Sequence, residues 1–285
     1  MDFRSSEAFD CYDRWLREDV GNGDYSSLSS IPEDSLGEST LILKDDGVVA
    51  GLEMAIAFFE FLDPHVEFVA FYQDGDFLKK GTILGTANGS LHSLLKGERL
   101  MLNLMQRLSG IATQTRNIVE LVKGTSVKIL DTRKTTPGLR MFEKWAVTQG
   151  GGYNHRMGLY DMVMLKDNHL DSAGGITTAV AHTKKYLNEH GLNLKIEVET
   201  RNLDEVKEAL KAGVDRIMFD NFTPELTIQG IKLVNGLCET ESSGGITLDT
   251  IAEYARTGVD FISVGSITHS VKALDISFKT KIKLE

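Results

Sequence analysis

The sequence has few cysteines and lacks the glycine-rich motifs that bind nucleotides. It has only two cysteines in 285 residues, Cys11 and Cys238, and they form neither a CxxC pair nor a metal-ligand spacing. We interpret both as reduced structural thiols of a cytosolic protein. Neither a GxGxxG motif nor a Walker A loop occurs, which argues against dinucleotides and P-loop nucleoside triphosphates as ligands.

Long apolar runs and positive charge are also scarce. The most apolar stretch, 48–62, is interrupted by Glu53 and Glu60 and is too short to span a bilayer. The N-terminal residues are charged from Asp2 onward, so we expect no signal peptide and a soluble, cytoplasmic protein. The net charge of -10 disfavours nucleic acid and anionic membranes as partners. An anionic ligand therefore needs a local cationic pocket.

The first third of the chain has the pattern of an α+β domain. Period-two and β-branched runs at 39–50 and 66–86 alternate with turn residues and predict an antiparallel sheet, while 52–62 has helical spacing. The longest helical pattern, 97–124, is interpreted as the link between two domains, with Ser109-Gly110 as a candidate break.

From residue 127 onward the pattern changes to strand, loop and helix, repeated. Strands are predicted at 127–130, 160–165, 194–198, 216–219, 237–240 and 260–264, with helices at 139–149, 176–189, 203–212, 224–234 and 248–257. This alternation is typical of a βα barrel, in which sites lie at the carboxyl ends of the strands. Six strands do not establish a closed barrel.

The fold class we expect is therefore α/β, with two domains. An N-terminal α/β sandwich domain covers 1–110, and an open, incomplete α/β barrel covers 111–270. The basic tail, 271–285, is expected to return to the first domain.

Charged residues or glycines follow the ends of the predicted strands. Gly244-Gly245 and Gly265-Ser266 each follow a strand and are expected to open a helix, which predicts phosphate-binding backbone loops in consecutive βα units. A tight turn is the alternative for either pair alone. Glu199 and Asp220 end neighbouring strands and suggest Mg²⁺ held partly through water and substrate oxygens, unless nearby cations neutralise both carboxylates.

The remaining strand ends predict a cationic wall opposite those carboxylates. Its members are Arg133, Lys134, His155, Arg156 and Lys166. Two guanidinium groups plus lysines match a ligand with two carboxylates, because arginine binds each carboxylate bidentately. Solvated surface cations and a structural histidine are the alternatives. His169 is expected to hold the Lys166 loop in shape, and the whole pattern points to group transfer onto a compact carboxylated molecule.

Arg99 lies in the first turn of the predicted helix 97–124. The helix dipole disfavours a cation there by a few tenths of a kcal/mol up to about 1 kcal/mol. Its position suggests a partner beyond the helix, and a surface salt bridge is an equal alternative.

These residues lie in segments that resemble a known family, quinolinate phosphoribosyltransferase, also called nicotinate-nucleotide pyrophosphorylase (carboxylating). The matching segments span nearly the whole chain in family order: EDVGNGD (18–24), GERLMLNLMQRLSGIAT (97–113), DTRKTTPGLR (131–140), GGGYNHRMGLYDMVMLKDNH (150–169), EVE (197–199), FDNF (219–222), SSGGI (242–246) and VGSITHS (264–270).

The resemblance implies an α/β sandwich followed by an open seven-stranded α/β barrel, assembled as a homodimer or a hexamer of dimers. It also implies the conversion of quinolinate and 5-phosphoribosyl-1-pyrophosphate, with Mg²⁺, into nicotinate mononucleotide, pyrophosphate and CO2 in de novo NAD synthesis. The implied partners are therefore small-molecule substrates.

The resemblance assigns roles to individual residues. It implies catalytic roles for Lys134, Glu199 and Asp220, with the two carboxylates near the ribose and the metal. Arg99 resembles an arginine that the partner subunit contributes. The full set of implied substrate contacts is Arg99, Thr132, Arg133, Lys134, His155, Arg156, Lys166, Glu199, Asp220, Ser243, Gly244, Gly245, Gly265, Ser266 and His269.

Two other functions fit part of the pattern. A paralogue such as the molybdenum-transport-associated relative would use another acceptor, but the complete KDNH (166–169) and GLYDM (158–162) segments favour quinolinate. A non-catalytic sugar-phosphate sensor would keep the glycine pairs without needing five convergent cations. The adjacent acidic pair of the other phosphoribosyltransferase fold is absent.

Overall fold

The computed structural model describes residues 1–283, which form two compact units. Unit 1 consists of residues 1–116, 141–151 and the tail from Ser270, and unit 2 consists of 117–140 and 152–269. The chain therefore passes from unit 1 to unit 2 twice and returns to unit 1 each time. Among residues 1–283, no helix has the length and apolar composition that crossing a membrane requires.

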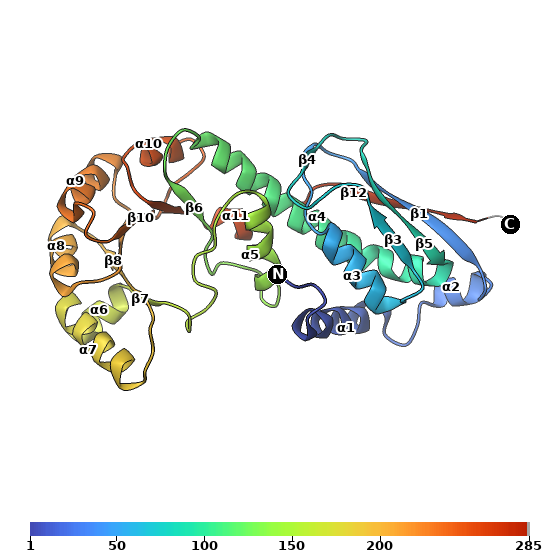
Figure 1. The fold of residues 1–285 in the computed structure, drawn as a ribbon, viewed down its shortest axis with the longest axis horizontal. Coiled ribbons are helices and arrows are strands. Elements are labelled where there is room, and N and C mark those ends of the chain that lie inside the picture. The colour runs from blue at the N-terminus through green and yellow to red at the C-terminus, as the bar shows by residue number, and fades with distance from the viewer. Residues whose placement is uncertain (284–285) are drawn as a thin grey trace. The chain divides into compact units, whose positions relative to one another are not determined.

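Unit 1 is an antiparallel sheet covered by helices (Figure 1). Its sheet has the order β12-β1-β5-β3, and its elements are α1 (Ser6–Val20), α2 (Tyr25–Ser30), β1 (Leu36–Leu43), β2 (Gly47–Val48), α3 (Leu52–Leu62), β3 (Glu67–Ala70), β4 (Phe77–Leu78), β5 (Ile83–Ser90) and β12 (Ile276–Ile282). Strand β12 pairs with β1 from Gly37↔Ile282 to Leu43↔Ile276. The expected return of the tail is thus what the structure shows, and Phe278 of β12 stacks on Phe59 and Phe68 in the core.

The segment 141–151 groups with unit 1, whereas the sequence placed it inside the second domain. It contains most of α5 (Arg140–Gln149), whose aromatic side chains pack on the N-terminal residues. The ring of Phe142 lies 5.3 Å from that of Trp15, and the ring of Trp145 lies 4.8 Å from that of Phe3. Burial of these rings accounts for the placement of α5.

Helix α4 (Leu91–Leu121) is continuous, so the candidate break at Ser109-Gly110 is wrong. Gly110 allows a close approach instead, because a Cβ there would lie 2.4 Å from the carbonyl oxygen of Lys272. The helix also begins earlier than predicted. Arg99 consequently lies more than two turns into α4, so the argument from the helix dipole fails.

Unit 2 is a parallel sheet with the order β6-β11-β10-β9-β8-β7. Its elements are β6 (Lys128–Leu130), β7 (Val163–Leu165), α6 (Asp167–Ala173), α7 (Ile176–Glu189), β8 (Ile196–Thr200), α8 (Leu203–Ala212), β9 (Arg216–Asp220), α9 (Pro224–Val234), β10 (Glu239–Ser243), α10 (Ile251–Ala255), β11 (Phe261–Ser263) and α11 (Ser266–His269). Helices α7, α8 and α9 line the outer side of the strands (Figure 1). All six predicted strands are present.

The barrel is open, as predicted, because the edge strands β6 and β7 do not pair with each other within residues 1–283. The seventh strand that the resemblance implied is reduced to a single bridge between Leu130 and Tyr153. Two residues later the N–H of His155 donates to Oδ1 of Asp131 at 2.8 Å, so a side chain takes the place of a strand partner.

Candidate active site

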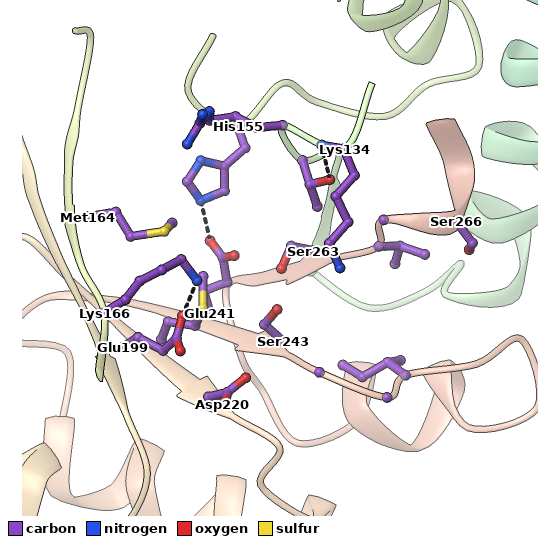
Figure 2. A pocket seen from close by; sticks show the side chains of 18 of the residues that line it. Lys134, His155, Met164, Lys166, Glu199, Asp220, Glu241, Ser243, Ser263 and Ser266 are labelled. Carbon is purple, nitrogen blue, oxygen red and sulfur yellow. Dashed lines mark hydrogen bonds and ion pairs between the residues drawn. The ribbon is translucent and has the colours of Figure 1, made fainter. Parts of the chain in front are cut away.

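A cavity of about 430 Å³ opens at the carboxyl ends of the unit 2 strands, and Figure 2 shows the side chains that surround it. That volume suits a small-molecule site. Every predicted site residue except Arg99, which belongs to unit 1, lines the cavity: Thr132, Arg133, Lys134, His155, Arg156, Lys166, Glu199, Asp220, Ser243, Gly244, Gly245, Gly265, Ser266 and His269. Met164, Met218, Glu241 and Ser263, which the sequence did not single out, also line it.

The loop after β6 is held in a fixed conformation beside the glycine loops. Oγ1 of Thr132 accepts a hydrogen bond from the N–H of Lys134 at 3.0 Å, and Oγ1 of Thr268 donates to the Lys134 carbonyl at 2.8 Å. The Lys134 side chain runs close to Gly265, where a Cβ would come within 3.2 Å of its Cδ. Lys134 is therefore the member of the cationic wall that lies against the loop at Gly265, and Figure 2 shows its side chain in the cavity.

Arg133 and Arg156 form the guanidinium part of the wall. Nη1 of Arg156 donates to the carbonyl of Met162 at 3.1 Å, which fixes its side chain in the half-buried wall. Burial and then the charge of Arg133 lower the pKa of Arg156, so an anion between the two groups would stabilise both charged forms. Arg140, which the sequence did not assign, joins the two loops by donating to the carbonyls of Arg133 and Met157 at 3.3 and 3.1 Å.

The acidic half of the cavity lies at the ends of β8 and β9, which are neighbours in the sheet. Nζ of Lys166 forms an ion pair with Glu199, and Nδ2 of Asn221 donates to Asp220 at 2.8 Å. Nδ1 of His169 accepts the N–H of Lys166 at 3.0 Å, so His169 holds this loop as predicted. Two carboxylates in one cavity suit Mg²⁺ that is completed by water and substrate oxygens.

The glycine loops differ from the prediction in one respect. Gly244 and Gly245 do not open a helix, because α10 begins only at Ile251, whereas Gly265 directly precedes the short helix α11. Gly244 and Gly245 have φ values of +89° and +63°, which glycine adopts without strain. A Cβ on Gly244 would lie 2.3 Å from Oδ1 of Asn221. The close approach explains the glycine and leaves bare backbone at the cavity.

The buried charged cluster around His155 was not predicted from the sequence. Nε2 of His155 lies 3.2 Å from Glu197 and 3.3 Å from Glu241, and Nη1 of Arg216 donates to the same Glu241 oxygen at 3.0 Å. Both glutamates are fully buried. The sequence signal for this cluster is a charged residue between two apolar residues of a parallel strand, as at Glu197 between Ile196 and Val198 in β8.

The protonation of His155 follows from its neighbours. Burial lowers the pKa of His155, whereas the hydrogen bonds and charges of Glu197 and Glu241 raise it. The backbone N–H of Arg156 donates to Nδ1 of His155 at 2.7 Å. This hydrogen bond needs the lone pair of Nδ1, so it opposes a proton on that nitrogen. The geometry favours a ring proton on Nε2. Burial and the charge of Glu241 raise the pKa of Glu197, which favours the protonated form of that carboxyl group.

Sequence comparison identifies the family. Residues 24–109 match the model for the N-terminal domain of quinolinate phosphoribosyl transferase, and residues 111–279 match the model for its C-terminal domain. The chain belongs to the quinolinate phosphoribosyl transferase family. The resemblance found in the sequence motifs is thereby confirmed.

Relatives in this family are similar to the chain over nearly its whole length. It is 45% identical to the chloroplastic nicotinate-nucleotide pyrophosphorylase [carboxylating] of Arabidopsis thaliana, over 95% of the chain and 82% of the relative. It is 46% identical to the probable nicotinate-nucleotide pyrophosphorylase [carboxylating] of Bacillus subtilis, over 94% of the chain and 91% of the relative. The crystal structure of NadC from Streptococcus pyogenes is 41% identical, with a TM-score of 0.92 and 96% of each chain covered. This likeness confirms the expected fold class.

Proposed function

We propose that this chain transfers the phosphoribosyl group of 5-phosphoribosyl-1-pyrophosphate to quinolinate and releases pyrophosphate and CO2, which yields nicotinate mononucleotide for NAD synthesis. The observation that carries the proposal is one cavity that gathers guanidinium and ammonium groups, two carboxylates and bare glycine loops. The membership of the chain in the quinolinate phosphoribosyl transferase family supports the same assignment.

The reaction breaks one bond at the ribose and one at the pyridine ring. The ring nitrogen forms a bond to the anomeric carbon as the bond from that carbon to pyrophosphate breaks. The carboxylate on the adjacent ring carbon then leaves as CO2, because the positive charge of the quaternary nitrogen stabilises the electron pair left behind. The electron pair that remains on the ring carbon takes up a proton from water.

The wall binds quinolinate and orients it. Arg133 and Arg156 each offer a planar fork to a carboxylate, and Lys166 adds a third cation at the end of β7. These groups are not nucleophiles in the proposed reaction. Their contribution is to hold the ring nitrogen in line with the anomeric carbon, where positioning accounts for most of the acceleration.

The opposite side receives phosphoribosyl pyrophosphate. Backbone at Gly244, Gly245 and Gly265 suits its 5-phosphate, because all three residues line the cavity and have no side chain of their own. Lys134, which lies beside Gly265, is placed to neutralise the departing pyrophosphate. Glu199 and Asp220 are placed to stabilise positive charge that develops on the ribose, which is why we assign catalytic roles to these two carboxylates and Lys134.

We also propose that Mg²⁺ is held by Glu199 and Asp220, partly through water. When bound, it neutralises charge on the pyrophosphate group. The test is activity in EDTA: we expect complete loss and recovery on adding Mg²⁺ in excess. Full activity after exhaustive chelation would contradict the metal requirement.

The assay that tests the function uses the purified protein with quinolinate, phosphoribosyl pyrophosphate and Mg²⁺, and follows nicotinate mononucleotide and CO2. Nicotinate, which lacks the second carboxylate, is the control acceptor. We expect product from quinolinate alone. Equal turnover of nicotinate, or no product from a folded protein that binds phosphoribosyl pyrophosphate, would contradict the proposed acceptor.

We further propose a homodimer in which Arg99 of one subunit completes the cavity of the other, either alone or within a hexamer. Arg99 is exposed on α4 and makes no hydrogen bond or ion pair with the other described residues. Unit 1 also exposes several large apolar side chains, including Phe71 (54% exposed) and Ile83 (47% exposed), as expected of an interface. Light scattering of the purified protein should give at least twice the 31.5 kDa chain mass, and a monomer would contradict this arrangement.

We propose a cytoplasmic location, supported by two free cysteines, Cys11 and Cys238. Cell fractionation with an antibody to the chain tests it. Recovery in an organelle fraction, as the name of the Arabidopsis relative would suggest, would contradict it.

A further inference from the structure

His155 lies at the cavity, yet both of its ring nitrogens are engaged by the protein. Nδ1 accepts the backbone N–H of Arg156 at 2.7 Å. Nε2 faces the carboxylates of Glu197 and Glu241 at 3.2 and 3.3 Å, and Figure 2 shows the contact with Glu241. Only 5% of the His155 side chain is exposed, which leaves little of it for a ligand.

The partners of His155 are themselves fixed. Nη1 of Arg216 donates to the Glu241 oxygen that faces His155, and Nη2 donates to Glu239 at 2.9 Å. The Arg216 guanidinium also lies 4.0 Å from the centre of the Phe261 ring. These contacts fix the Arg216 guanidinium. From it a continuous series of contacts runs through Glu241 and His155 to the backbone of Arg156.

The other end of this series is a member of the cationic wall. The backbone of Arg156 is set by the imidazole, and its guanidinium is set by the Met162 carbonyl. The negative charge of Glu197 also favours the charged form of Arg156, which burial and Arg133 disfavour. The buried cluster therefore acts on the wall both through geometry and through charge.

We propose that His155 is a positioning residue that acts through Arg156, held in place by Glu241, Glu197 and Arg216, and does not itself bind the acceptor carboxylate. This inference rests on the proposed function and changes the direct substrate contact that the sequence assigned to His155. A metal ion is a poorer explanation of the cluster, although the ligand atoms of His155, Glu197 and Glu241 lie within 4.8 Å of one another. Arg216 already supplies the positive charge that two buried carboxylates require.

The decisive test is a double-mutant cycle between His155→Gln and Arg156→Ala, with the KM for quinolinate as the readout. The glutamine amide reaches the position of Nε2 but offers no acceptor at the position of Nδ1. We expect this variant to raise the quinolinate KM about tenfold, as for one displaced charged contact, and to leave the KM for phosphoribosyl pyrophosphate unchanged. In the Arg156→Ala background we expect the same substitution to change the quinolinate KM less than about twofold.

A second variant controls for folding and for the nitrogen involved. In His155→Asn the amide oxygen is positioned near Nδ1 and still accepts the Arg156 N–H, so we expect a smaller rise in quinolinate KM than in His155→Gln. A full tenfold effect of His155→Gln in the Arg156→Ala background would overturn the proposal, because it would show a direct contact with quinolinate. A larger effect of Asn than of Gln would also overturn it.

A measurement without substrate separates this proposal from the proposed function. In the ¹⁵N NMR spectrum of protein labelled at histidine, the His155 resonances are assigned by their loss in His155→Asn. At neutral pH we expect an unprotonated Nδ1 and a protonated Nε2. A proton on Nδ1 would overturn the positioning role whatever the acceptor is. An inactive wild-type protein with the expected spectrum would instead contradict only the choice of quinolinate.

Discussion

Replacement of Arg133 by alanine separates binding from stability, because its side chain makes no hydrogen bond or ion pair with other residues in 1–283. Its carbonyl accepts from Arg140 at 3.3 Å and from the N–H of Thr135 at 2.9 Å, and both contacts survive in alanine. We expect the free energy of unfolding to change by less than about 0.5 kcal/mol. Loss of a charge-assisted contact to a carboxylate should cost about 1.5–3 kcal/mol, which lowers kcat/KM for quinolinate about 10- to 150-fold.

The assay is the initial rate of nicotinate mononucleotide formation at saturating phosphoribosyl pyrophosphate and Mg²⁺, with thermal unfolding measured on the same preparation. Arg133→Lys keeps the charge but not the fork, and should fall between alanine and the wild type. Arg256→Ala is the matched control, because Arg256 is exposed in unit 2 and does not line the cavity. A natively folded Arg133→Ala protein with near-normal kcat/KM would refute the assignment of the wall.

Three further predictions address the subunit contact, the core and the glycine loop. Arg99→Ala and Arg133→Ala should each retain at most about one tenth of wild-type kcat/KM. An equilibrated equal mixture should recover about one quarter of wild-type activity, because half of the dimers then hold one intact site of two; no recovery would argue against a shared site. Arg107→Met removes the ion pair of the buried Glu143 and should lower the free energy of unfolding in urea by about 3 kcal/mol, and a loss below about 1 kcal/mol would contradict this. Gly244→Ala should raise the KM for phosphoribosyl pyrophosphate about tenfold or more at unchanged quinolinate KM, and equal rises in both would point to a general disturbance.

The spacing of apolar residues predicted the helices and strands whose position depends on burying one face of the segment. Helices α3, α7, α8 and α9 have the predicted bounds, and the end of every predicted strand reaches the cavity. These features depend on apolar spacing within one segment, which the sequence displays directly.

Features that depend on contacts between distant segments were predicted less well. Gly110 was interpreted as a helix break, but it lets the backbone at Lys272 approach the helix closely. A helix break and a close backbone approach both favour glycine, so the sequence alone does not separate them. The start of α4 was placed too late because Leu91 follows β5 directly, without a loop to mark the boundary. Glu197 and Glu241 were missed as a pair because their partner, His155, lies on a different segment.

The pairing of β12 with β1 affects the order in which the chain can fold during synthesis. Domains usually fold as the ribosome releases them, with the N-terminal one first. Here the residues of unit 2, 117–140 and 152–269, are all made before β12, whereas β1 has only one of its two neighbours until Ile276–Ile282 emerges. The nascent chain therefore carries an exposed sheet edge through most of translation, and the later-made unit 2 is the first that can be completed.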